Sequence, residues 1–502
     1  MKYIVSGSEM NRIDEFAINE IGIPQMVLME RAALCVYNHI KSKFNPKAKI
    51  LIVVEGGNNG ADGIALARML LHDRYNVEVF YIDGIKTSSA FDMQYSIAKK
   101  LGVNFIDEIV DCGYDVVVDA VFGVGLSRTI TGKQAETINI MNEIDGYKLA
   151  VDIPSGIDSS TGFVLGTAFK ADTTITFGLM KEGLLTGLGS EYGGKIIVED
   201  IGIPQKAVDF VRPRYYTYEE ADLDKLLPYR KIDSHKGSFG KIGIIGGSKN
   251  MAGAAMFSAE AAYRMGCGLV RVCTTEENRE IMQINLPEAM LTTYNPDNID
   301  SVRKAVKETI KWSDVIVLGP GLGQDHIAEY ITRKVLFYYE KHVVIDADGL
   351  NVLSKNMDYF RNTKAKLIIT PHLMEMSRLT GVKAGQIKEK KYEIAREFSK
   401  NYGAIVVLKD ARTVVSDGGT QAYINITGNN GMATGGSGDV LTGIIAGLLG
   451  QGMPMFEAAK LGVCMHGLAG QEAANDKGRY SMIARDIIRS ITRVLESDYY
   501  VG

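Results

Sequence analysis

The chain has 502 residues, of which 46% are hydrophobic and 23% are charged, and its formal net charge is −4 at pH 7. This length exceeds what one hydrophobic core usually organises, so two folded domains are expected. The composition excludes a disordered chain, and the small negative charge excludes the basic field that gathers nucleic acid or an anionic membrane surface.

Cysteine usage and the amino terminus bear on the compartment. The five cysteines are scattered and form no CxxC pair, which is typical of a reduced cytosolic protein. Residues 1–7 lack the apolar core of a signal peptide, and glycines or polar residues interrupt every apolar run before it reaches membrane-spanning length. We expect a cytoplasmic protein, with neither nucleic acid nor a membrane as a partner.

Short β-rich runs in the first part of the chain are separated by helical patterns. The expected strands are residues 50–54, 77–81, 116–119, 149–152 and 173–177. Continuous apolar strands that alternate with helices suit a parallel sheet covered on both faces. We therefore predict an N-terminal Rossmann-like, doubly wound α/β domain.

The same alternation restarts in the second part and predicts a second α/β domain. Its expected strands are residues 242–245, 269–272, 315–318, 343–346, 367–369 and 405–408. We place the domains at 1–210 and 225–495, with the charged, tyrosine-containing segment 211–224 as a linker. The charged run 388–391 lies among Ile387, Ile394 and Phe398 at helical spacing and predicts a solvated helix face.

Ligands of open α/β sheets bind at the carboxyl ends of the strands, and polar motifs lie there in the first domain. After the strand at 50–54 come Glu55, four glycines, two amides and Asp62 within residues 55–63, at the start of a helix. A tight turn alone would explain the glycines, but the amides and the carboxylate exceed what a turn needs. Asp119 could cap a helix and Ser155-Gly156 could form a plain turn, yet three such strand ends favour one binding crevice.

These segments resemble the NAD(P)H-hydrate epimerases, also called the YjeF N-terminal domain, over about residues 8–205. Asp14, residues 28–30, Ala171-Asp172, Thr176-Phe177-Gly178 and Lys181 belong to the same resemblance. The chain departs from the family at Glu55-Gly56-Gly57, where Gly-x-Gly is frequent, and at Ala61, where glycine is usual.

The resemblance implies a potassium site and a site for the hydrated nicotinamide nucleotide. Oxygen ligands for K⁺ would come from Asn59, Asp119 and Ser155. Epimerisation at the hydroxylated ring carbon needs a general acid or base, and Asp152 is the candidate because it ends a strand in the crevice. The implied nucleotide contacts are Asn58, Asn59, Gly60, Ala61, Asp62, Gly123, Val124, Gly125, Leu126, Ser127, Arg128, Thr129 and Asp152.

The strongest motif of the second domain is Gly435-Gly436-Ser437-Gly438-Asp439, which precedes an apolar helix. The N–H groups of such a loop form an anion cradle, and Asp439 in the first helical turn would be a proton acceptor beside it. Helix capping also explains an acid at Asp439, but capping needs no run of small residues before it. Gly-x-Gly-Asp before a helix is characteristic of ribokinase-like enzymes, in which the aspartate activates a substrate hydroxyl.

With the glycine and polar strand ends at 319–323, 346–351 and 370–375, residues 225–495 resemble the NAD(P)H-hydrate dehydratases, a ribokinase-like family commonly fused to the epimerase. The resemblance implies ADP or ATP as co-substrate with Mg²⁺. It implies contacts to the hydrate from Ala254, Gly323, His372 and Asp439. It implies that the nucleotide is held by Lys409, Asp410, Ala411, Arg412, Thr413, Gly435, Gly436, Ser437 and Gly438.

Three segments of the second domain depart from the family pattern. The family usually has His-Pro-Gly-Glu, Lys-Gly and Asn-Pro-Gly where this chain has His372-Leu373-Met374-Glu375, Lys409-Asp410 and Asn429-Asn430-Gly431. Lost proline and glycine change loop rigidity. Asp410 also adds an anion where a polyphosphate would approach, which would oppose nucleotide binding.

The predicted function is repair of hydrated NADH and NADPH (NADHX and NADPHX). The first domain would interconvert the R and S hydrates, and the second would dehydrate the S form with ADP or ATP, in a homo-oligomeric enzyme that is both isomerase and lyase. A ribokinase-like small-molecule kinase and a non-catalytic nucleotide sensor remain alternatives. Free phosphate and recovered NAD(P)H would distinguish repair from both.

Overall fold

In the computed structural model, which describes residues 2–83, 86–110, 113–219 and 222–496, all five strands predicted in the first part lie in one parallel sheet. The strand order is β4-β3-β2-β5-β6-β7-β9. The strands are β2 (Lys49–Val54), β3 (Asn76–Tyr81), β4 (Asn104–Ile106), β5 (Val116–Ala120), β6 (Tyr147–Val151), β7 (Thr173–Phe177) and β9 (Lys195–Glu199). The chain runs outward in opposite directions from β2 and from β5, so the carboxyl ends of these two strands flank the crevice where ligands bind in such sheets.

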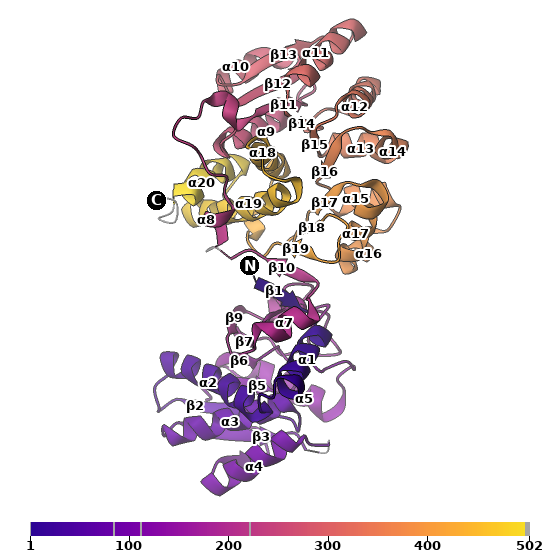
Figure 1. Cartoon of the computed structure of the whole chain (residues 1–502). Helices are drawn as coiled ribbons and strands as arrows, with labels where there is room; N and C mark the ends of the chain where they lie inside the picture. The colour runs from indigo at the N-terminus through magenta and orange to yellow at the C-terminus, as the bar shows by residue number, and fades with distance from the viewer. Residues whose placement is uncertain (1, 84–85, 111–112, 220–221, 497–502) are drawn as a thin grey trace. The chain divides into compact units, whose positions relative to one another are not determined.

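Alternate residues of the strands enter two separate cores, which confirms a doubly wound sheet. Ile50, Ile52 and Val54 of β2 pack against α2 (Gln25–Lys43), α3 (Asn58–His72) and α4 (Ser89–Leu101). Leu51 and Val53 pack on the opposite face against α5 (Gly132–Glu143). Figure 1 shows these helices around the sheet of the N-terminal unit.

The remaining elements of this unit lie beside the main sheet. β1 (Lys2–Val5) pairs in parallel with β8 (Met180–Lys181). A small core that includes Ile13 and Val208 packs α1 (Gly7–Glu15) on α7 (Gln205–Val211). The other elements are the π-helical turn η1 (Phe16–Glu20), η2 (Glu182–Leu184) and α6 (Gly189–Tyr192).

All six strands predicted in the second part also form. They belong to a sheet in which β13, β18 and β19 are added, in the order β13-β12-β11-β14-β15-β16-β17-β18-β19. Pairing is parallel from β13 to β17 and antiparallel from β17 to β19. The strands are β11 (Lys241–Ile245), β12 (Leu269–Thr275), β13 (Met290–Tyr294), β14 (Val315–Leu318), β15 (His342–Ile345), β16 (Lys366–Ile369), β17 (Ile405–Leu408), β18 (Val414–Ser416) and β19 (Ala422–Ile424).

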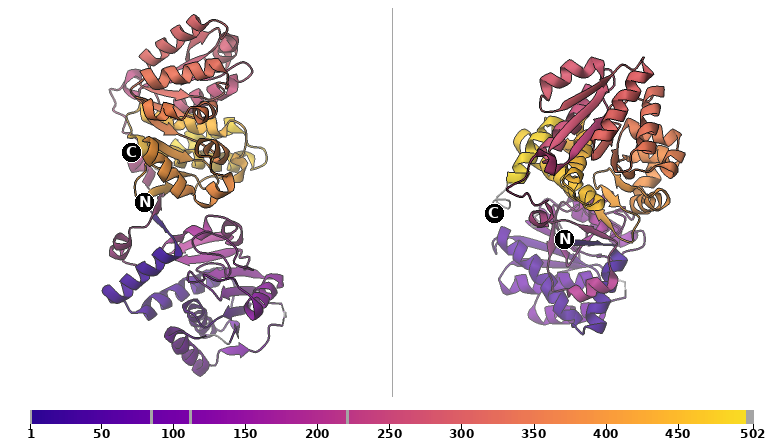
Figure 2. Two further views of the ribbon diagram at one scale, coloured as in Figure 1. Left: turned by 90° about the vertical axis from the view of Figure 1, so that its right-hand side faces the viewer. Right: turned by 45° about the horizontal axis from the view of Figure 1, so that its top comes forward.

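Helices cover both faces of this second sheet, as Figures 1 and 2 show. On one side lie α9 (Ala252–Arg264), α18 (Ser437–Gly450), α19 (Met455–Lys477) and α20 (Ala484–Glu496). On the other side lie α11 (Ile299–Trp312), α12 (His326–Tyr338), α13 (Asp348–Lys355), α14 (Asp358–Asn362), α15 (Leu373–Thr380), α16 (Ala384–Glu389) and α17 (Lys391–Tyr402). The shorter elements are η4 (Lys236–Phe239), η5 (Glu276–Asn278), α10 (Arg279–Asn285) and η6 (Asn430–Met432). Within the described ranges no helix is long and apolar enough to cross a membrane.

The chain divides into two units between Tyr215 and Tyr216, inside the segment 211–224. That segment is not irregular throughout, since it contains β10 (Tyr215–Thr217) and the beginning of α8 (Leu223–Leu226). Its residues 220–221 lie outside the described part of the chain.

One expectation for the charged run at 388–391 is wrong. The run does not lie on a single solvated helix face, because α16 ends at Glu389 and α17 begins at Lys391, whose side chain is only 9% exposed. Its ammonium lies 2.9 Å from the Asp410 carboxylate, which compensates for its burial. The helical spacing of the apolar residues does not reveal such an ion pair, because the partner comes from a distant loop.

The close packing of α18 on α9 requires glycine at position 443. A Cβ atom at Gly443 would lie 2.2 Å from the Ser258 carbonyl oxygen. We expect Gly443→Ala to destabilise the fold by about 1–3 kcal/mol and to lower Tm, as measured by thermal unfolding. Gly385→Ala in α16 is the control, because a Cβ there meets nothing within 4 Å and alanine favours a helix. An unchanged Tm for Gly443→Ala would contradict this packing argument.

Candidate active sites

A cavity of about 490 Å³ opens at the carboxyl ends of β2, β5 and β6 in the N-terminal unit. Residues after β2 turn directly into α3, and glycine is required at position 60, where a Cβ would lie 1.7 Å from the Glu55 carbonyl oxygen. This close approach sets the first turn of α3 against the strand end. The free N–H groups of that turn are suited to an anion or a polar ligand.

Most of the predicted nucleotide contacts line this cavity. Gly60, Ala61 and Thr129 are not among its lining residues. The predicted residues that line it are Asn58, Asn59, Asp62, Gly123, Val124, Gly125, Leu126, Ser127, Arg128 and Asp152.

Asp119 and Ser155 form a buried hydrogen-bonded pair between neighbouring strand ends. The Ser155 hydroxyl donates to Asp119 Oδ1 at 2.6 Å, and the Ser155 N–H donates to Oδ2 at 2.7 Å. Burial raises the pKa of Asp119 to about 6, although these hydrogen bonds oppose the shift. Asp119 is therefore neither a helix cap nor exposed, and Ser155 is more than part of a plain turn.

Asn59 lies close to this region, since a Cβ at Gly123 would approach its side chain to 3.4 Å. Its Nδ2 atom is buried and has no hydrogen-bond partner among the described residues. An unsatisfied buried amide is costly, and the oxygen and nitrogen of an asparagine amide exchange places by a flip of the side chain. The site thus offers amide, carboxylate and hydroxyl oxygens, the hard donors that K⁺ accepts.

Asp152 lies at the end of β6 with φ of +67°, a conformation that is uncommon outside glycine. Its Oδ1 accepts hydrogen bonds from the Thr176 hydroxyl at 3.1 Å and from Lys181 Nζ at 2.7 Å. Lys181 is 1% exposed and also donates to the Phe177 carbonyl oxygen. The buried lysine therefore fixes the Asp152 carboxylate at the wall of the cavity.

Two further carboxyl groups line the cavity beside Asp152. Burial raises the pKa of Asp14 to about 7, with Lys181 opposing and Asp152 adding to the shift. Burial and the charge of Asp152 also raise the pKa of Asp62 well above its ordinary value. From the sequence, Asp14 and Lys181 were named only as part of the family resemblance, without a role at the site.

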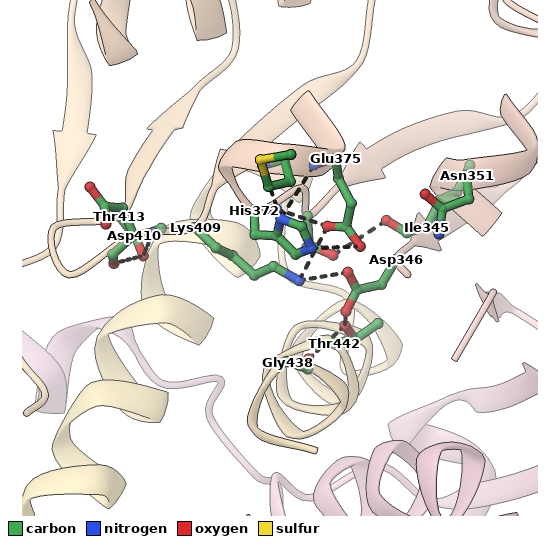
Figure 3. Close-up of polar contacts among 12 residues, drawn as sticks. Ile345, Asp346, Asn351, His372, Glu375, Lys409, Asp410, Thr413, Gly438 and Thr442 are labelled. Atoms are coloured by element: carbon green, nitrogen blue, oxygen red, sulfur yellow. Dashed lines mark hydrogen bonds and ion pairs between the residues drawn. The ribbon is translucent and has the colours of Figure 1, made fainter. Parts of the chain in front are cut away.

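In the C-terminal unit, a buried ion pair lies between two strand ends (Figure 3). Asp346 follows β15, and Lys409 follows β17 and donates to Asp346 Oδ1 at 2.7 Å. The Thr442 hydroxyl of α18 donates to the other carboxylate oxygen at 2.8 Å. Burial alone would raise the pKa of Asp346, but the Lys409 ammonium keeps this pKa below its ordinary value. The sequence marked Asp346 only as one of several polar residues at strand ends.

The predicted glycine loop and Asp439 meet this ion pair at the beginning of α18. Gly436 caps the helix with φ of +90°, and a Cβ at Gly438 would lie 3.2 Å from Lys409 Nζ. Burial raises the pKa of Asp439 to about 7, with Asp346 adding to the shift and Lys409 opposing it. A carboxyl group with this pKa exchanges a proton readily near neutral pH.

Ser437 of the same loop contacts a histidine that was not predicted from the sequence. Its hydroxyl lies 3.2 Å from Nε2 of His466, which is buried in α19. Burial lowers the pKa of His466 to about 4, so the ring is neutral at physiological pH. A single histidine on an apolar helix gives no sequence signal of such a contact.

Ala254 packs against the loop 319–323, which contains Gly323. A Cβ at Gly321 would approach the Ala254 side chain to 3.1 Å, and the Gly323 N–H donates to Asp348 Oδ2 at 3.0 Å. Asp348 adds to the raised pKa of Asp439 through its charge. Two of the residues predicted to contact the hydrate thus share this region.

His372 forms the N-terminal cap of α15. Its Nδ1 accepts from the Met374 and Glu375 N–H groups, and the Glu375 carboxylate accepts from the His372 N–H. Burial raises the pKa of Glu375 to about 7, whereas burial lowers that of His372. The helix start is therefore well capped despite Leu373 and Met374.

The loop 409–413 joins the antiparallel strands β17 and β18. Asp410 was expected to oppose a polyphosphate, but its carboxylate is paired with Lys391 at 2.9 Å. Burial alone would raise the pKa of Asp410, but Lys391 keeps this pKa below its ordinary value. The Asp410 charge is therefore compensated within the fold, and its effect on nucleotide binding stays a prediction.

Two family models match the chain. The model described as NAD(P)H-hydrate dehydratase matches residues 242–493, and the model described as YjeF-related protein N-terminus matches residues 25–183. The first covers the sites at Asp346, Lys409 and Asp439. The second covers the cavity residues from Gln25 to Lys181.

Individual relatives agree with these models. The chain aligns with the bifunctional NAD(P)H-hydrate repair enzyme of Moorella thermoacetica at 37% identity, over 99% of this chain and 97% of that protein. The ADP/ATP-dependent NAD(P)H-hydrate dehydratase from Bacillus subtilis, co-crystallised with ATP and Mg²⁺, is 28% identical with a TM-score of 0.50, over 56% of this chain and 97% of that one. A ribokinase-like superfamily protein from Enterococcus faecalis is 30% identical with a TM-score of 0.50, over 56% of this chain and 95% of that one. The chain belongs to the family of bifunctional NAD(P)H-hydrate repair enzymes.

Proposed function

We propose that the chain returns NADHX and NADPHX to NADH and NADPH through two active sites. Residues 1–210 interconvert the R and S hydrates, residues 225–495 dehydrate the S form with ADP or ATP, and 211–224 connect them. The observation that carries this function is the relationship to a bifunctional repair enzyme over 99% of the chain. The buried carboxyl groups at both sets of strand ends support it.

At the second site, Asp439 acts as the general base. It removes the proton of the substrate hydroxyl as that oxygen attacks the terminal phosphorus of the nucleotide. The carbon–oxygen bond of the phosphorylated hydrate then breaks, phosphate leaves, and loss of a proton from the adjacent carbon restores the ring double bond. The alternative kinase activity would stop at the phosphorylated product.

The nucleotide is held by the cradle Gly435, Gly436, Ser437 and Gly438 and by the loop from Lys409 to Thr413. N–H groups at the beginning of α18 favour the phosphates, and the adjacent Lys409 ammonium adds positive charge. The described residues contain no cluster of three His, Cys, Asp or Glu suited to a metal ion. Mg²⁺ would therefore be bound chiefly by the nucleotide phosphates.

At the first site, Asp152 exchanges a proton with the hydroxyl on the ring carbon. Lys181 holds its carboxylate in place at 2.7 Å. A potassium ion bound by Asn59, Asp119 and Ser155 would stabilise negative charge on the nearby nucleotide. The buried Asn59 amide without a partner and the oxygen donors beside it support that ion.

A cytoplasmic, homo-oligomeric enzyme is part of the same proposal. Cys35, Cys267 and Cys273 form no disulfide, in keeping with a reducing compartment. Cys112 lies outside the described residues.

The function as a whole is tested by mixing the enzyme with both NADHX epimers, Mg²⁺ and either ADP or ATP. Repair predicts that both epimers disappear, that reduced nicotinamide absorbance returns, and that phosphate is released. A stable phosphorylated product would instead establish a kinase, and binding without turnover would establish a sensor.

We expect Asp439→Asn to lower the rate of dehydration by about 10²–10⁴-fold, the range typical of a lost general base. Because the active form is the carboxylate and burial raises its pKa to about 7, kcat/KM should fall as the pH drops through 7 and level off above it. Asp300→Asn is the control, because Asp300 also lies in the first turn of a helix but is exposed. A flat pH profile between 6 and 8, or parental turnover by Asp439→Asn, would overturn the assignment.

We expect Asp152→Asn to abolish epimerisation and leave dehydration intact. With a mixture of epimers and excess nucleotide, the variant should consume only the S form, as followed by chromatography of the two hydrates. Its rate on the S form is the internal control for folding of the second site. Disappearance of both epimers at the parental rates would exclude Asp152 as the acid or base.

Replacement of K⁺ by Na⁺ should slow epimerisation without changing dehydration of the S form. The hydroxyl removed in Ser155→Ala is one of the proposed ligands, so this variant should need more K⁺ for half-maximal epimerisation. Titration of the epimerisation rate with KCl at constant ionic strength measures both effects. A rate that does not depend on K⁺ would remove the ion from the proposal.

A further inference from the structure

Lys391 occupies a position that is unfavourable for a lysine on local grounds. It is the first residue of α17, where the helix dipole disfavours a positive charge, and its side chain is only 9% exposed. Burial lowers the pKa of Lys391, and the charges of Arg412 and Lys388 act in the same direction. A buried cation at a helix N-terminus requires compensation from elsewhere in the fold.

The compensation comes from the hairpin loop 409–413. Lys391 Nζ contacts Asp410 Oδ2 at 2.9 Å and donates to the Arg412 carbonyl oxygen at 3.0 Å. One ammonium therefore ties two positions of the loop to the beginning of α17. Thr413 closes the loop from the other side, since its hydroxyl donates to the Asp410 carbonyl oxygen at 3.1 Å.

The loop is also attached to the ion pair beside Asp439. The Lys409 N–H donates to the Pro371 carbonyl oxygen at 2.8 Å, and Lys409 Nζ donates to Asp346. Figure 3 shows Asp410 and Thr413 next to the stem of Lys409, whose ammonium points toward Asp346. A displacement of Asp410 would therefore be transmitted through the neighbouring residue to the phosphate cradle.

Charge balance in the loop depends on the same lysine. Asp410 is the negative charge that acts on the Arg412 guanidinium, whose Nε is buried and has no hydrogen-bond partner in the described ranges. With Asp410 neutralised by Lys391, the loop as a whole keeps a positive charge through Arg412. Without Lys391, Asp410 would cancel that charge and repel an approaching polyphosphate.

We infer that Lys391 is a positioning residue for the nucleotide: it neutralises Asp410 and fixes the loop 409–413 in the form that receives the polyphosphate. This inference rests on the proposed role of the loop in nucleotide binding. Lys391 acts through Asp410 and Arg412.

The test is a double-mutant cycle measured with ADP and with ATP in the presence of Mg²⁺. Lys391→Met leaves Asp410 uncompensated, so KM for the nucleotide should rise by about tenfold, or ~1.4 kcal/mol, with little change in kcat or in KM for the hydrate. Asp410→Asn alone leaves the buried Lys391 ammonium without its carboxylate and loosens the loop, so KM for the nucleotide should also rise, but less than in Lys391→Met because no anion faces the polyphosphate. The double variant should recover, because it removes both the buried charge and its partner.

Two further variants keep the result interpretable. Lys391→Gln retains a donor for the Arg412 carbonyl oxygen without the charge, so it should fold even if Lys391→Met does not, and its nucleotide KM should still rise. Lys390→Met is the matched control, because it removes the same charge from the exposed neighbouring residue and should leave all constants unchanged.

The possible outcomes separate this inference from the function on which it rests. If calorimetry shows that the parent binds neither ADP nor ATP, the proposed nucleotide site fails. If the parent binds but the Lys391 variants match it, or change kcat and both KM values together without recovery by Asp410→Asn, then Lys391 has a structural role only and the inference is overturned.

Discussion

A parallel sheet covered by helices on both faces leaves only the ends of its strands for polar chemistry, and this constraint organises both units. The faces of the strands are filled by apolar side chains such as Ile52 and Leu51 of β2. A carboxyl group at a strand end therefore has the apolar core on one side and the ligand crevice on the other. Burial likewise raises to about 7 the pKa values of three carboxyl groups in helices, Asp14 in α1, Asp439 in α18 and Glu375 in α15.

A buried lysine contacts one carboxylate at each site. Lys181 contacts Asp152 and Lys409 contacts Asp346, each at 2.7 Å. At the second site, Lys409 keeps the pKa of Asp346 below its ordinary value, while burial raises the pKa of Asp439 to about 7. The second site therefore holds a fixed anion, Asp346, beside a group that exchanges protons near neutral pH, Asp439, and acid–base catalysis uses such a division.

The sequence predicted the architecture well, because apolar strand runs are local signals. The runs that became β2, β5, β14 and β17 are four to six residues long and lie between glycine or polar segments. β18 and β19 have three residues each and were missed, since so short a segment carries no period. The antiparallel end of the second sheet was therefore absent from the predicted fold.

Site residues were predictable where a glycine loop marked them and not where burial and distant pairing created them. Asp439 follows four small residues and could be singled out from the chain alone. His466 and Lys391 could not, because a lysine or histidine in a helix is usually exposed or incidental. Asp410 shows this limit most clearly. From the sequence it is an added anion that would repel a polyphosphate, and only the structure shows that Lys391, 19 residues earlier, lies 2.9 Å from its carboxylate.

The presence of both sites in one chain follows from the different thermodynamics of the two reactions. An epimerase cannot change the ratio of the R and S hydrates at equilibrium; it changes only the rate at which they interconvert. Dehydration coupled to cleavage of a nucleotide phosphate bond removes one epimer irreversibly, so it draws the other through the epimerase for as long as nucleotide is present. Epimerisation is therefore useful only as fast as dehydration consumes the S hydrate. A single chain supplies the two activities in a constant ratio, and the hydrate need not pass directly from one site to the other.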